Sequence, residues 1–261
     1  MIRVALCGAA GRMGREISSA VDAAAEMKLV LAIERPDHPE LGAMINSVIL
    51  QDDLRMHFTA CDVIVDFTTP QGTVKHAGIA VEKATAFVTG TTGLEGTQID
   101  ALHEAAKSIP LLFASNMSMG MTVMGALTRT AARNLPGTYD TEIMEMHHRR
   151  KQDAPSGTAL RLAGILREER SKLELRHGRS GRTGKRSGQE LGVHALRGGD
   201  VVGEHHVIFA GPGERLILTH IADNRGAFVS GVLAALEFIV GQPAGFYGME
   251  EVLGARPEDS P

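Results

Sequence analysis

A glycine-rich turn near the N-terminus constrains the fold of this chain more than any other feature. Residues 2–7, IRVALC, form a β-prone run, and GAAGRMG follows at once at residues 8–14. An amphipathic stretch at residues 12–26 then predicts a helix. In such a unit the glycines allow a tight turn, close approach of the backbone to a pyrophosphate, and close packing of helix on strand. The spacing G-x-x-G-x-x-G therefore indicates a dinucleotide-binding domain, although a plain tight turn is the alternative.

A charged pair follows the second predicted strand, which spans residues 28–33. Glu34 lies about 20 residues beyond the glycines, where a carboxylate that binds the adenosine ribose is expected. Arg35 beside it could hold the 2′-phosphate of NADPH, so the pair predicts that both NADH and NADPH are accepted. A solvated charge pair at the end of a strand is the alternative.

The order of strand, turn and helix recurs along the N-terminal half of the chain. After a stretch expected to be irregular at residues 36–60, apolar runs begin at residues 61, 87 and 111, and turn residues follow each of them. This alternation predicts a doubly wound parallel sheet, whose ligands bind beyond the carboxyl ends of the strands. The turns at residues 90–93 and 114–117 are therefore candidates for contact with the nicotinamide half of the cofactor, although a capping role is equally compatible.

Composition excludes several classes of protein. The 261 residues suffice for one large domain or two smaller ones, and a net charge of −4 argues against a general nucleic-acid binder. No stretch approaches the ~20 apolar residues that would cross a membrane. Two cysteines, Cys7 and Cys61, are too few for a disulfide framework, and the N-terminus does not resemble a signal peptide. We therefore expect a cytoplasmic protein.

A cluster of cationic side chains marks the middle of the chain. HHRRK at residues 147–151 directly follows a predicted strand, and a predicted helix at residues 159–170 begins after DAPSGT. The first-turn amides of that helix attract anions, and the hydroxyls of Ser156 and Thr158 can add hydrogen bonds. These features predict a site for a substrate with at least one carboxylate. A solvated basic loop beside an ordinary helix cap is the alternative.

Two side chains of this cluster are candidates for proton transfer. His147 and Lys151 could each supply a proton near neutral pH. His147 and His148 would point to opposite sides of a strand, so we do not expect them to share a metal ion, and no metal is predicted. A second histidine pair, His205 and His206, lies in a strand-like run and is expected to be structural.

The rest of the chain predicts a second domain and a return to the first. A long helix at residues 119–134 and β-prone runs at 139–147, 191–209 and 214–222 indicate a mixed sheet. The basic, glycine-rich residues 176–190 are expected to form a long mobile or inter-subunit loop, because no aromatic side chains accompany the cations as in RNA-binding segments.

These patterns divide the chain into three segments. Residues 1–118 are expected to form the dinucleotide-binding domain, and residues 119–226 a domain for substrate binding and oligomerisation. Residues 227–261 are expected to return to the first domain and to end in a frayed tail at 257–261.

The motifs resemble those of the dihydrodipicolinate reductase family over nearly the whole chain. The resemblance is carried by GAAGRMG, DFTTP, GTTG, ASNMSMG, EMHHRRKQDAPSGTA and GVHALRGGDVVGEHHVIF. It implies a Rossmann-like doubly wound sheet plus a smaller α+β domain, and a homotetramer built through the sheets of the second domains. The implied reaction is NAD(P)H-dependent reduction of 4-hydroxy-tetrahydrodipicolinate, a cyclic dicarboxylate, to tetrahydrodipicolinate in lysine and diaminopimelate biosynthesis.

The resemblance also implies roles for individual residues. His147 would be the catalytic acid or base, and Lys151 a proton donor and carboxylate partner. With the hydroxyl of Ser156, the substrate would contact His148, Gly157 and Thr158. The residues that would line the cofactor are Gly8, Ala9, Ala10, Gly11, Arg12, Met13, Glu34, Arg35, Gly90, Thr91, Thr92, Ala114, Ser115, Asn116 and Met117.

This chain departs from the pattern of the family at two positions. Thr69 stands where many relatives carry arginine, which would weaken contact with a 2′-phosphate, and His206 replaces a commoner threonine with no expected effect.

Two other functions are alternatives to the reductase. One alternative is an imine or amino-acid dehydrogenase such as aspartate dehydrogenase, but the HHRRK and DAPSGT segments argue against it. The other is a sensor or scaffold protein that binds NADPH without catalysis.

Overall fold

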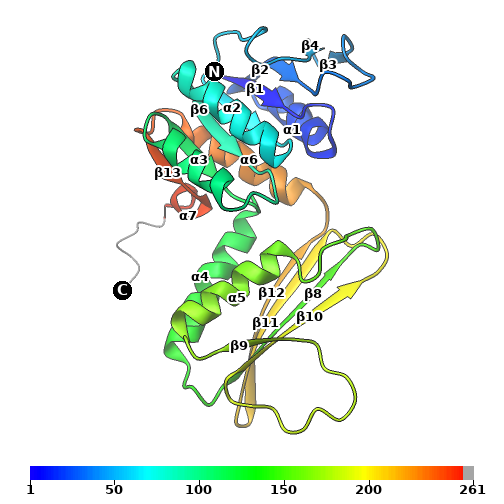
Figure 1. The fold of residues 1–261 in the computed structure, drawn as a ribbon, viewed down its shortest axis with the longest axis vertical. Coiled ribbons are helices and arrows are strands. Elements are labelled where there is room, and N and C mark those ends of the chain that lie inside the picture. Colours follow the sequence, from blue (N-terminus) through cyan, green and yellow to red (C-terminus); the bar gives the residue numbers. More distant parts are fainter. Residues whose placement is uncertain (255–261) are drawn as a thin grey trace. The chain divides into compact units, whose positions relative to one another are not determined.

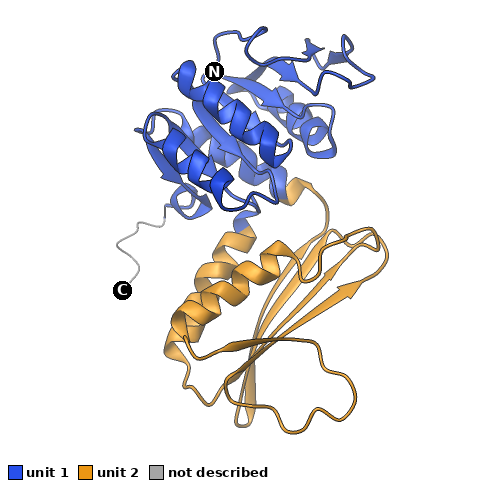
Figure 2. Ribbon diagram, viewed as in Figure 1, with its two compact units in different colours: residues 1–119, 228–261 blue, residues 120–227 orange. Residues whose placement is uncertain are grey.

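The computed structural model describes residues 1–254, so the expected tail at 257–261 lies outside the described residues. Contacts divide the chain into two compact units, Met1–Met119 with Phe228–Pro261 and Gly120–Ala227 (Figure 2). The chain passes between the units within α4 (Met119–Asn134) and again within α6 (Gly226–Ile239). Within residues 1–254, no helix combines the length and apolar character needed to span a membrane.

An eight-stranded sheet forms the centre of the first unit, in the order β13-β7-β6-β5-β1-β2-β4-β3. Neighbouring strands are parallel except for the antiparallel pair β3 and β4. The order reverses between β1 and β5, the kind of switch point beyond which ligands bind. The strands are β1 Ile2–Cys7, β2 Met27–Ile33, β3 Met44–Ile45, β4 Val48–Gln51, β5 Val63–Asp66, β6 Ala86–Thr89, β7 Pro110–Phe113 and β13 Gly245–Tyr247.

Helices cover both faces of this sheet (Figure 1). On one face, α1 (Arg12–Ala23) and α6 bury side chains such as Ile17 and Leu236, and α7 (Met249–Val252) adds Met249. On the other face, α2 (Pro70–Glu82) and α3 (Thr97–Ala106) bury Ile79 and Leu102. Because the central strands are buried on both faces, they are apolar throughout rather than alternating. The predicted doubly wound sheet is confirmed.

The stretch expected to be irregular at residues 36–60 contains a short hairpin, so that expectation was wrong. Strands β3 and β4 pair through a two-residue turn in which Asn46 adopts a φ of 53°. Strand β4 then extends the sheet by pairing with β2. Asparagine tolerates this left-handed conformation, but strands of two and four residues leave almost no periodic signal in a sequence.

A mixed five-stranded sheet forms the second unit, in the order β12-β11-β8-β10-β9. Strands β8, β10 and β9 are parallel neighbours, whereas β8, β11 and β12 are antiparallel. The prediction of a mixed sheet is confirmed, although the directions of individual strands were not predicted. Helices α4 and α5 (Gly157–Glu169) pack on one face around Ile143, Val207 and Phe209 (Figure 1). The strands are β8 Asp140–His147, β9 Glu174–His177, β10 Glu190–Arg197, β11 Gly203–Gly211 and β12 Glu214–Ala222.

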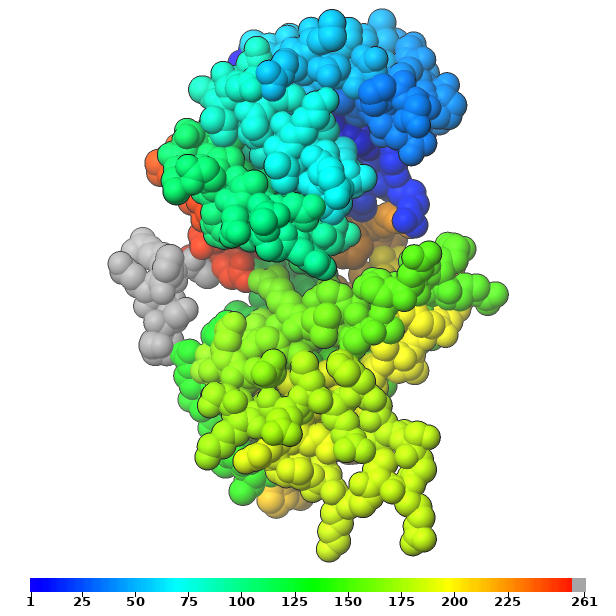
Figure 3. Space-filling view, in the orientation of Figure 1, coloured from blue at the N-terminus to red at the C-terminus, as the bar shows by residue number. Residues whose placement is uncertain are grey.

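The basic segment between β9 and β10 lies at the surface of this unit (yellow-green in Figure 3). Two of its arginines anchor it, because Arg179 and Arg186 both donate hydrogen bonds to the Glu142 carboxylate on β8. Burial raises the pKa of Glu142, but these bonds and one from His194 outweigh burial and lower it to about 2. The segment is therefore tied to the sheet at both of these arginines.

Candidate active site

The loop after β1 has the geometry that its glycines predict. Gly8 adopts a φ of +80°, and a Cβ atom there would lie 2.5 Å from the carbonyl oxygen of Phe67. A Cβ atom on Gly14 would lie 2.1 Å from the carbonyl oxygen of Gly8, so a larger residue would force α1 away from the loop. Helix α1 begins after Gly11 without a side-chain cap. Such an uncapped helix start is suited to binding the phosphates of a dinucleotide.

The charged pair after β2 lies beside this loop. The Glu34 carboxylate accepts hydrogen bonds from the backbone N–H groups of Ala10 at 3.2 Å and Arg35 at 3.1 Å. Glu34 therefore lies beside the glycine loop, while its contact with the adenosine ribose stays a prediction. The Arg35 guanidinium pairs with Asp37 at 3.1 Å, but both side chains are mostly exposed, and such a pair is weak.

A fully buried aspartate that we did not predict organises the ends of β5 and β6. The Asp66 carboxylate accepts hydrogen bonds from the hydroxyls of Thr68 at 2.8 Å, Thr91 at 3.0 Å and Thr73, and contacts Nδ1 of His76 at 2.8 Å. Thr91 also accepts a hydrogen bond from the backbone N–H of Thr68. These bonds fix the GTTG turn, one of the predicted cofactor segments.

The same aspartate lies close to Cys7 and His76, and ligand atoms of the three residues fall within 4.8 Å of one another. A metal ion would need the carboxylate oxygens and a thiolate. The oxygens already accept hydrogen bonds from threonine hydroxyls, and burial raises the pKa of the Cys7 thiol well above its usual range. The contacts therefore fit a hydrogen-bonded network better than a metal site.

The remaining predicted cofactor residues follow β6 and β7, at the same edge of the sheet. A Cβ atom on Gly90 would lie 2.3 Å from the Phe67 ring, so this turn also requires glycine. Ala114 and Met117 are 8% and 2% exposed, so that a ligand would meet mainly their backbone. The structure thus gathers the predicted residues at the carboxyl ends of β1, β2, β6 and β7, while their contact with a cofactor stays a prediction.

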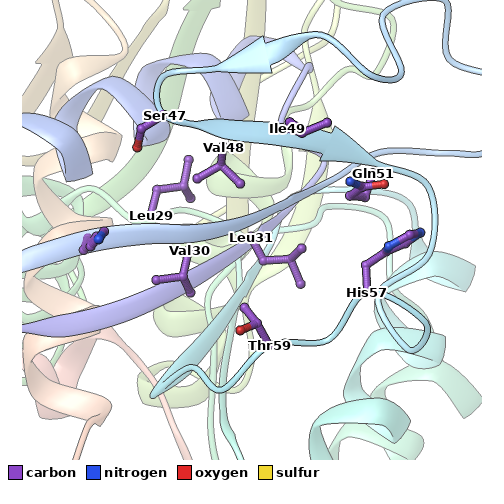
Figure 4. Close-up of a pocket in the computed structure, with 10 residues that line it drawn as sticks. Leu29, Val30, Leu31, Ser47, Val48, Ile49, Gln51, His57 and Thr59 are labelled. Carbon is purple, nitrogen blue, oxygen red and sulfur yellow. The ribbon is translucent and has the colours of Figure 1, made fainter.

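A hollow of about 570 Å³ lies elsewhere in the first unit, against β2 and β4 (Figure 4). Its apolar walls include Val30, Leu31 and Ile49, and His57 and Thr59 lie at one side. None of the predicted site residues lines it. Lys28 is the one lysine or arginine among its lining residues and most of the walls are apolar, so this hollow does not suit a dicarboxylate.

In the second unit, a buried charge network lies behind His147. Glu145 and His147 share the face of β8 that packs against the helices, and Glu145 is 0% exposed. One carboxylate oxygen of Glu145 contacts Nδ1 of His147 at 2.5 Å and Nη1 of Arg197 at 2.8 Å. The other accepts hydrogen bonds from Nη2 of Arg197 at 2.9 Å and from the backbone N–H of Ser156 at 3.1 Å. Both oxygens are thus fully engaged.

These contacts set the protonation states of both groups. Burial opposes the charge on Glu145 most strongly, but the bonds from Arg197, His147 and Ser156 outweigh it and lower the pKa of Glu145. Burial also lowers the pKa of His147, although the Glu145 carboxylate acts in the opposite direction. Because an ionised carboxylate only accepts, Nδ1 of His147 donates to it. Nε2 is the ring atom left to exchange a proton with a ligand.

Two further residues shape the surroundings of the His147 ring. His205 on β11 meets it edge-on, with ring centroids 5.1 Å apart, and burial lowers the pKa of His205 to about 3. Nε2 of His205 lies 3.2 Å from the Ser156 hydroxyl. A Cβ atom on Gly203 would lie 3.2 Å from Nε2 of His147, so glycine leaves that atom accessible. His206 faces the other side of the sheet, where it contacts Thr219 and Glu204.

The predicted substrate residues surround the start of α5, which begins at Gly157, two residues earlier than expected. Ser156 is its N-cap, since its hydroxyl accepts a hydrogen bond from the backbone N–H of Ala159 at 3.2 Å. That hydroxyl is buried and engaged within the protein, so its predicted contact with substrate stays a prediction. Gly157 is exposed, whereas Thr158 and His148 are half-buried.

The cationic side chains of this cluster differ in their exposure and in their ion pairs. Arg149 and Arg150 are exposed, whereas Lys151 is 22% exposed and its Nζ pairs with Asp153 at 2.9 Å. Asp153 is itself 57% exposed, so an incoming carboxylate can compete for the ammonium group. The structure therefore brings His147, Lys151 and the start of α5 into one unit of the molecule.

Sequence reasoning missed Glu145, Arg197, His205 and Asp66. The alternation of β8 correctly placed Glu145 on the face of Ile143, and a carboxylate on a core face is a signal that we could have used. Arg197 becomes the neighbour of His147 only through the parallel pairing of β10 with β8, across 50 residues of sequence. No local pattern contains that pairing.

Comparison with known proteins agrees with this geometry. Family models described as the N-terminus and C-terminus of dihydrodipicolinate reductase match residues 2–117 and 120–253. The 4-hydroxy-tetrahydrodipicolinate reductase of Nitrosomonas eutropha is 41% identical over 98% of this chain and 99% of its own length. The protein of that name from Anaeromyxobacter sp. strain Fw109-5 is 44% identical, with the same coverage.

A solved structure extends the likeness to three dimensions. A dipicolinate-bound dihydrodipicolinate reductase from Paenisporosarcina sp. TG-14 superposes with a TM-score of 0.77 at 28% identity, covering 96% of this chain and 98% of that one. Both halves of the sequence, and both folded units, therefore have counterparts in a single family. This chain belongs to the dihydrodipicolinate reductase family.

Proposed function

We propose that this protein is an NAD(P)H-dependent 4-hydroxy-tetrahydrodipicolinate reductase of lysine and diaminopimelate biosynthesis. The match of both halves of the chain to one reductase family carries the proposal. In it, residues 1–118 together with 227–261 bind the cofactor, and residues 119–226 bind the substrate. The dinucleotide-type loop of the first unit and the cationic cluster of the second supply the two sites that the reaction needs.

The first unit suits a dinucleotide. Gly8 and Gly14 let the loop approach a pyrophosphate, and the start of α1 can bind its phosphates. Glu34 would accept hydrogen bonds from the adenosine ribose, and Asp66 would hold the GTTG turn in place beside the nicotinamide half. When bound, the reduced nicotinamide supplies the hydride.

The second unit suits a ring with two carboxylates. Arg149, Arg150 and Lys151 provide positive charge, and the start of α5 provides backbone N–H groups near Gly157. Charge-assisted bonds of this kind are roughly twice as strong as neutral ones. Thr158 and His148 would add hydrogen bonds to the same ligand.

His147 and Lys151 provide the proton that accompanies the hydride, and the 4-hydroxyl group of the substrate leaves as water. The unliganded site favours neutral His147, because burial lowers its pKa. A bound dicarboxylate adds negative charge nearby, which favours the protonated imidazole of His147. Binding of the substrate and protonation of His147 are then coupled. Nε2 of His147 can donate the proton as general acid.

Both NADH and NADPH should be accepted. Arg35 is mostly exposed and only weakly held by Asp37, so it can turn toward a 2′-phosphate. Thr69, which caps α2 by accepting a hydrogen bond from the backbone N–H of Gly72, provides no charge for that phosphate. Comparison of the Michaelis constants of the two cofactors tests this; a preference above about a hundredfold, equivalent to ~2.7 kcal/mol, would contradict dual use.

Four copies of the chain should assemble through the second sheet. The face of this sheet that the helices leave uncovered carries Leu196, Ile217 and Ile221, which are 42%, 49% and 56% exposed. This face also carries the polar Glu204 and His206, and a mixture of exposed apolar and polar side chains fits an interface between subunits. We place the assembly in the cytoplasm, in keeping with two buried free cysteines.

A coupled assay tests the proposed function. The substrate is formed in situ from pyruvate and aspartate semialdehyde, and the absorbance of NADH and NADPH is followed separately. We expect oxidation that depends on the substrate, and competitive inhibition by pyridine-2,6-dicarboxylate at millimolar concentration or below. Oxidation with aspartate-derived imines alone would favour an amino-acid dehydrogenase, and cofactor binding without any oxidation would favour a sensor protein.

A further inference from the structure

We propose that Glu145 and Arg197 are positioning residues for His147: the buried carboxylate fixes the ring and its tautomer, and the arginine keeps that carboxylate charged and in place. This inference rests on the proposed function only for the role of His147 in the reaction. The arrangement itself concerns the free protein and can be tested there.

The geometry leaves little freedom to the carboxylate. Arg197 grips both oxygens of Glu145 with two parallel hydrogen bonds of 2.8 and 2.9 Å. A planar guanidinium fork of this kind fixes direction as well as charge, which a lysine cannot do. The contact to Nδ1 of His147, at 2.5 Å, therefore reaches the ring from a rigid partner, and Nε2 is directed toward the space that Gly203 leaves open.

The same pair holds the start of the proposed substrate helix. Glu145 accepts a hydrogen bond from the backbone N–H of Ser156, the N-cap of α5. Arg197 donates through Nη2 to the carbonyl oxygen of Asp153 at 2.6 Å. One buried ion pair thus sets the position of the histidine and of the turn that begins α5.

The charges around His147 predict opposite effects of removing the two partners. The groups that face His147 are Glu145 on its own strand, Arg197 on β10, His205 on β11 and Lys151 in the following loop. Glu145 favours the protonated ring, whereas Arg197 and Lys151 disfavour it. Loss of the carboxylate should therefore make His147 harder to protonate, and loss of the arginine should make it easier.

The test uses Glu145→Gln and Arg197→Gln in the full-length protein, with imidazole ¹⁵N NMR as a readout that requires no catalysis. The His147 resonances are assigned by comparison with His147→Gln. We expect the pKa of His147 to fall in Glu145→Gln and to rise in Arg197→Gln, each by about one unit, because an adjacent charge typically shifts a pKa by 1–3 units. The Nδ1-protonated tautomer should be lost in Glu145→Gln.

Kinetics provide the second readout. The alkaline limb of the pH profile of kcat should move to lower pH in Glu145→Gln and to higher pH in Arg197→Gln. At neutral pH, kcat of Glu145→Gln should fall at least tenfold, less than the 10²–10⁴-fold contribution of a complete acid–base group, since part of the ring population remains correctly placed. The Michaelis constant for the cofactor should not change in either variant.

Glu169→Gln is the matched control for lost stability. Glu169 lies in the same unit and also accepts a two-bond fork, from Arg133 at 3.0 Å, but it contacts no histidine. The Glu169→Gln substitution should lower Tm without moving the pH profile of kcat. Equal pH behaviour of Glu145→Gln, Arg197→Gln and Glu169→Gln would overturn the inference. If the NMR shifts appear as expected but the protein reduces no cyclic dicarboxylate, the positioning pair stands and the proposed function fails.

Discussion

At the scale of single residues, burial and a neighbouring carboxylate act on His147 in opposite directions. Burial lowers its pKa, and Glu145 works against that effect through a contact of 2.5 Å. A ligand that brings negative charge can therefore shift the balance near neutral pH. The ammonium group of Lys151 can also contact a ligand, because its partner Asp153 is mostly exposed and can be displaced.

Removal of either proton donor should abolish most turnover. His147→Ala and Lys151→Ala should each reduce kcat by ~10²–10³, the usual cost of losing one group that stabilises developing charge or donates a proton. Stopped-flow or steady-state oxidation of NADH measures this loss, and cofactor binding should persist because neither residue lies in the first unit. Lys172→Ala, an exposed lysine of the second unit, serves as the control. Wild-type turnover in both variants would contradict the assigned roles.

A single methyl group on Gly14 should disrupt the cofactor loop. The added Cβ would lie 2.1 Å from the Gly8 carbonyl oxygen, so α1 must move away from β1. We expect Gly14→Ala to weaken NADH binding at least tenfold in fluorescence titration and to lower Tm. Gly78→Ala is the control, since a Cβ atom in that position of α2 meets nothing within 4 Å. Alanine in a helix should stabilise that variant by up to ~1 kcal/mol.

At the scale of helices and strands, the sequence predicted those elements that a local pattern of residues determines. The helix at residues 119–134 was predicted with its observed bounds, and the alternation of β8 placed Ile143 and Glu145 on one face correctly. The hairpin of β3 and β4 was missed because each strand is too short for a period. Arg197 and His205 were missed as neighbours of His147 because strand pairing, not sequence proximity, brings them there.

The burial of His205 on β11 also predicts how the stability of the protein depends on pH. Burial lowers the pKa of His205 to about 3, so the unfolded chain, with a histidine pKa near ~6.5, binds more protons at acidic pH. Neutral His205 therefore stabilises the fold above pH ~6.5, and this contribution is lost as the pH falls from there toward ~3. At pH ~5 the loss should reach ~2 kcal/mol, or ~4–8 °C in Tm.

His205→Gln isolates this effect. Thermal unfolding of wild type and variant at pH ~7.5 and ~5 should show a smaller acid-induced fall of Tm in the variant, because glutamine does not titrate. His147 is present in both proteins, so its own protonation contributes to the fall of Tm in each. An equal fall of Tm in both would mean that His205 is protonated in the folded state near its ordinary pKa.

At the scale of the whole molecule, the proposed assembly depends on the uncovered face of the second sheet. Ile217→Glu should reduce the tetramer to smaller species in sedimentation-velocity experiments, because an apolar contact would be replaced by a buried charge. Ile49→Glu is the matched control, since Ile49 is equally exposed, at 49%, but lies on β4 of the other unit. A tetramer that persists in Ile217→Glu would place the interface elsewhere.

In the proposed reaction, a hydride passes from the cofactor bound by the first unit to a ring bound by the second. The most direct measurement uses NADH deuterated at both C4 positions of the nicotinamide, with substrate formed in situ and the product analysed by mass spectrometry. We expect one carbon-bound deuterium in the tetrahydrodipicolinate formed, with the accompanying proton taken from solvent. A product without deuterium, or oxidation of NADH that leaves the ring unreduced, would contradict it.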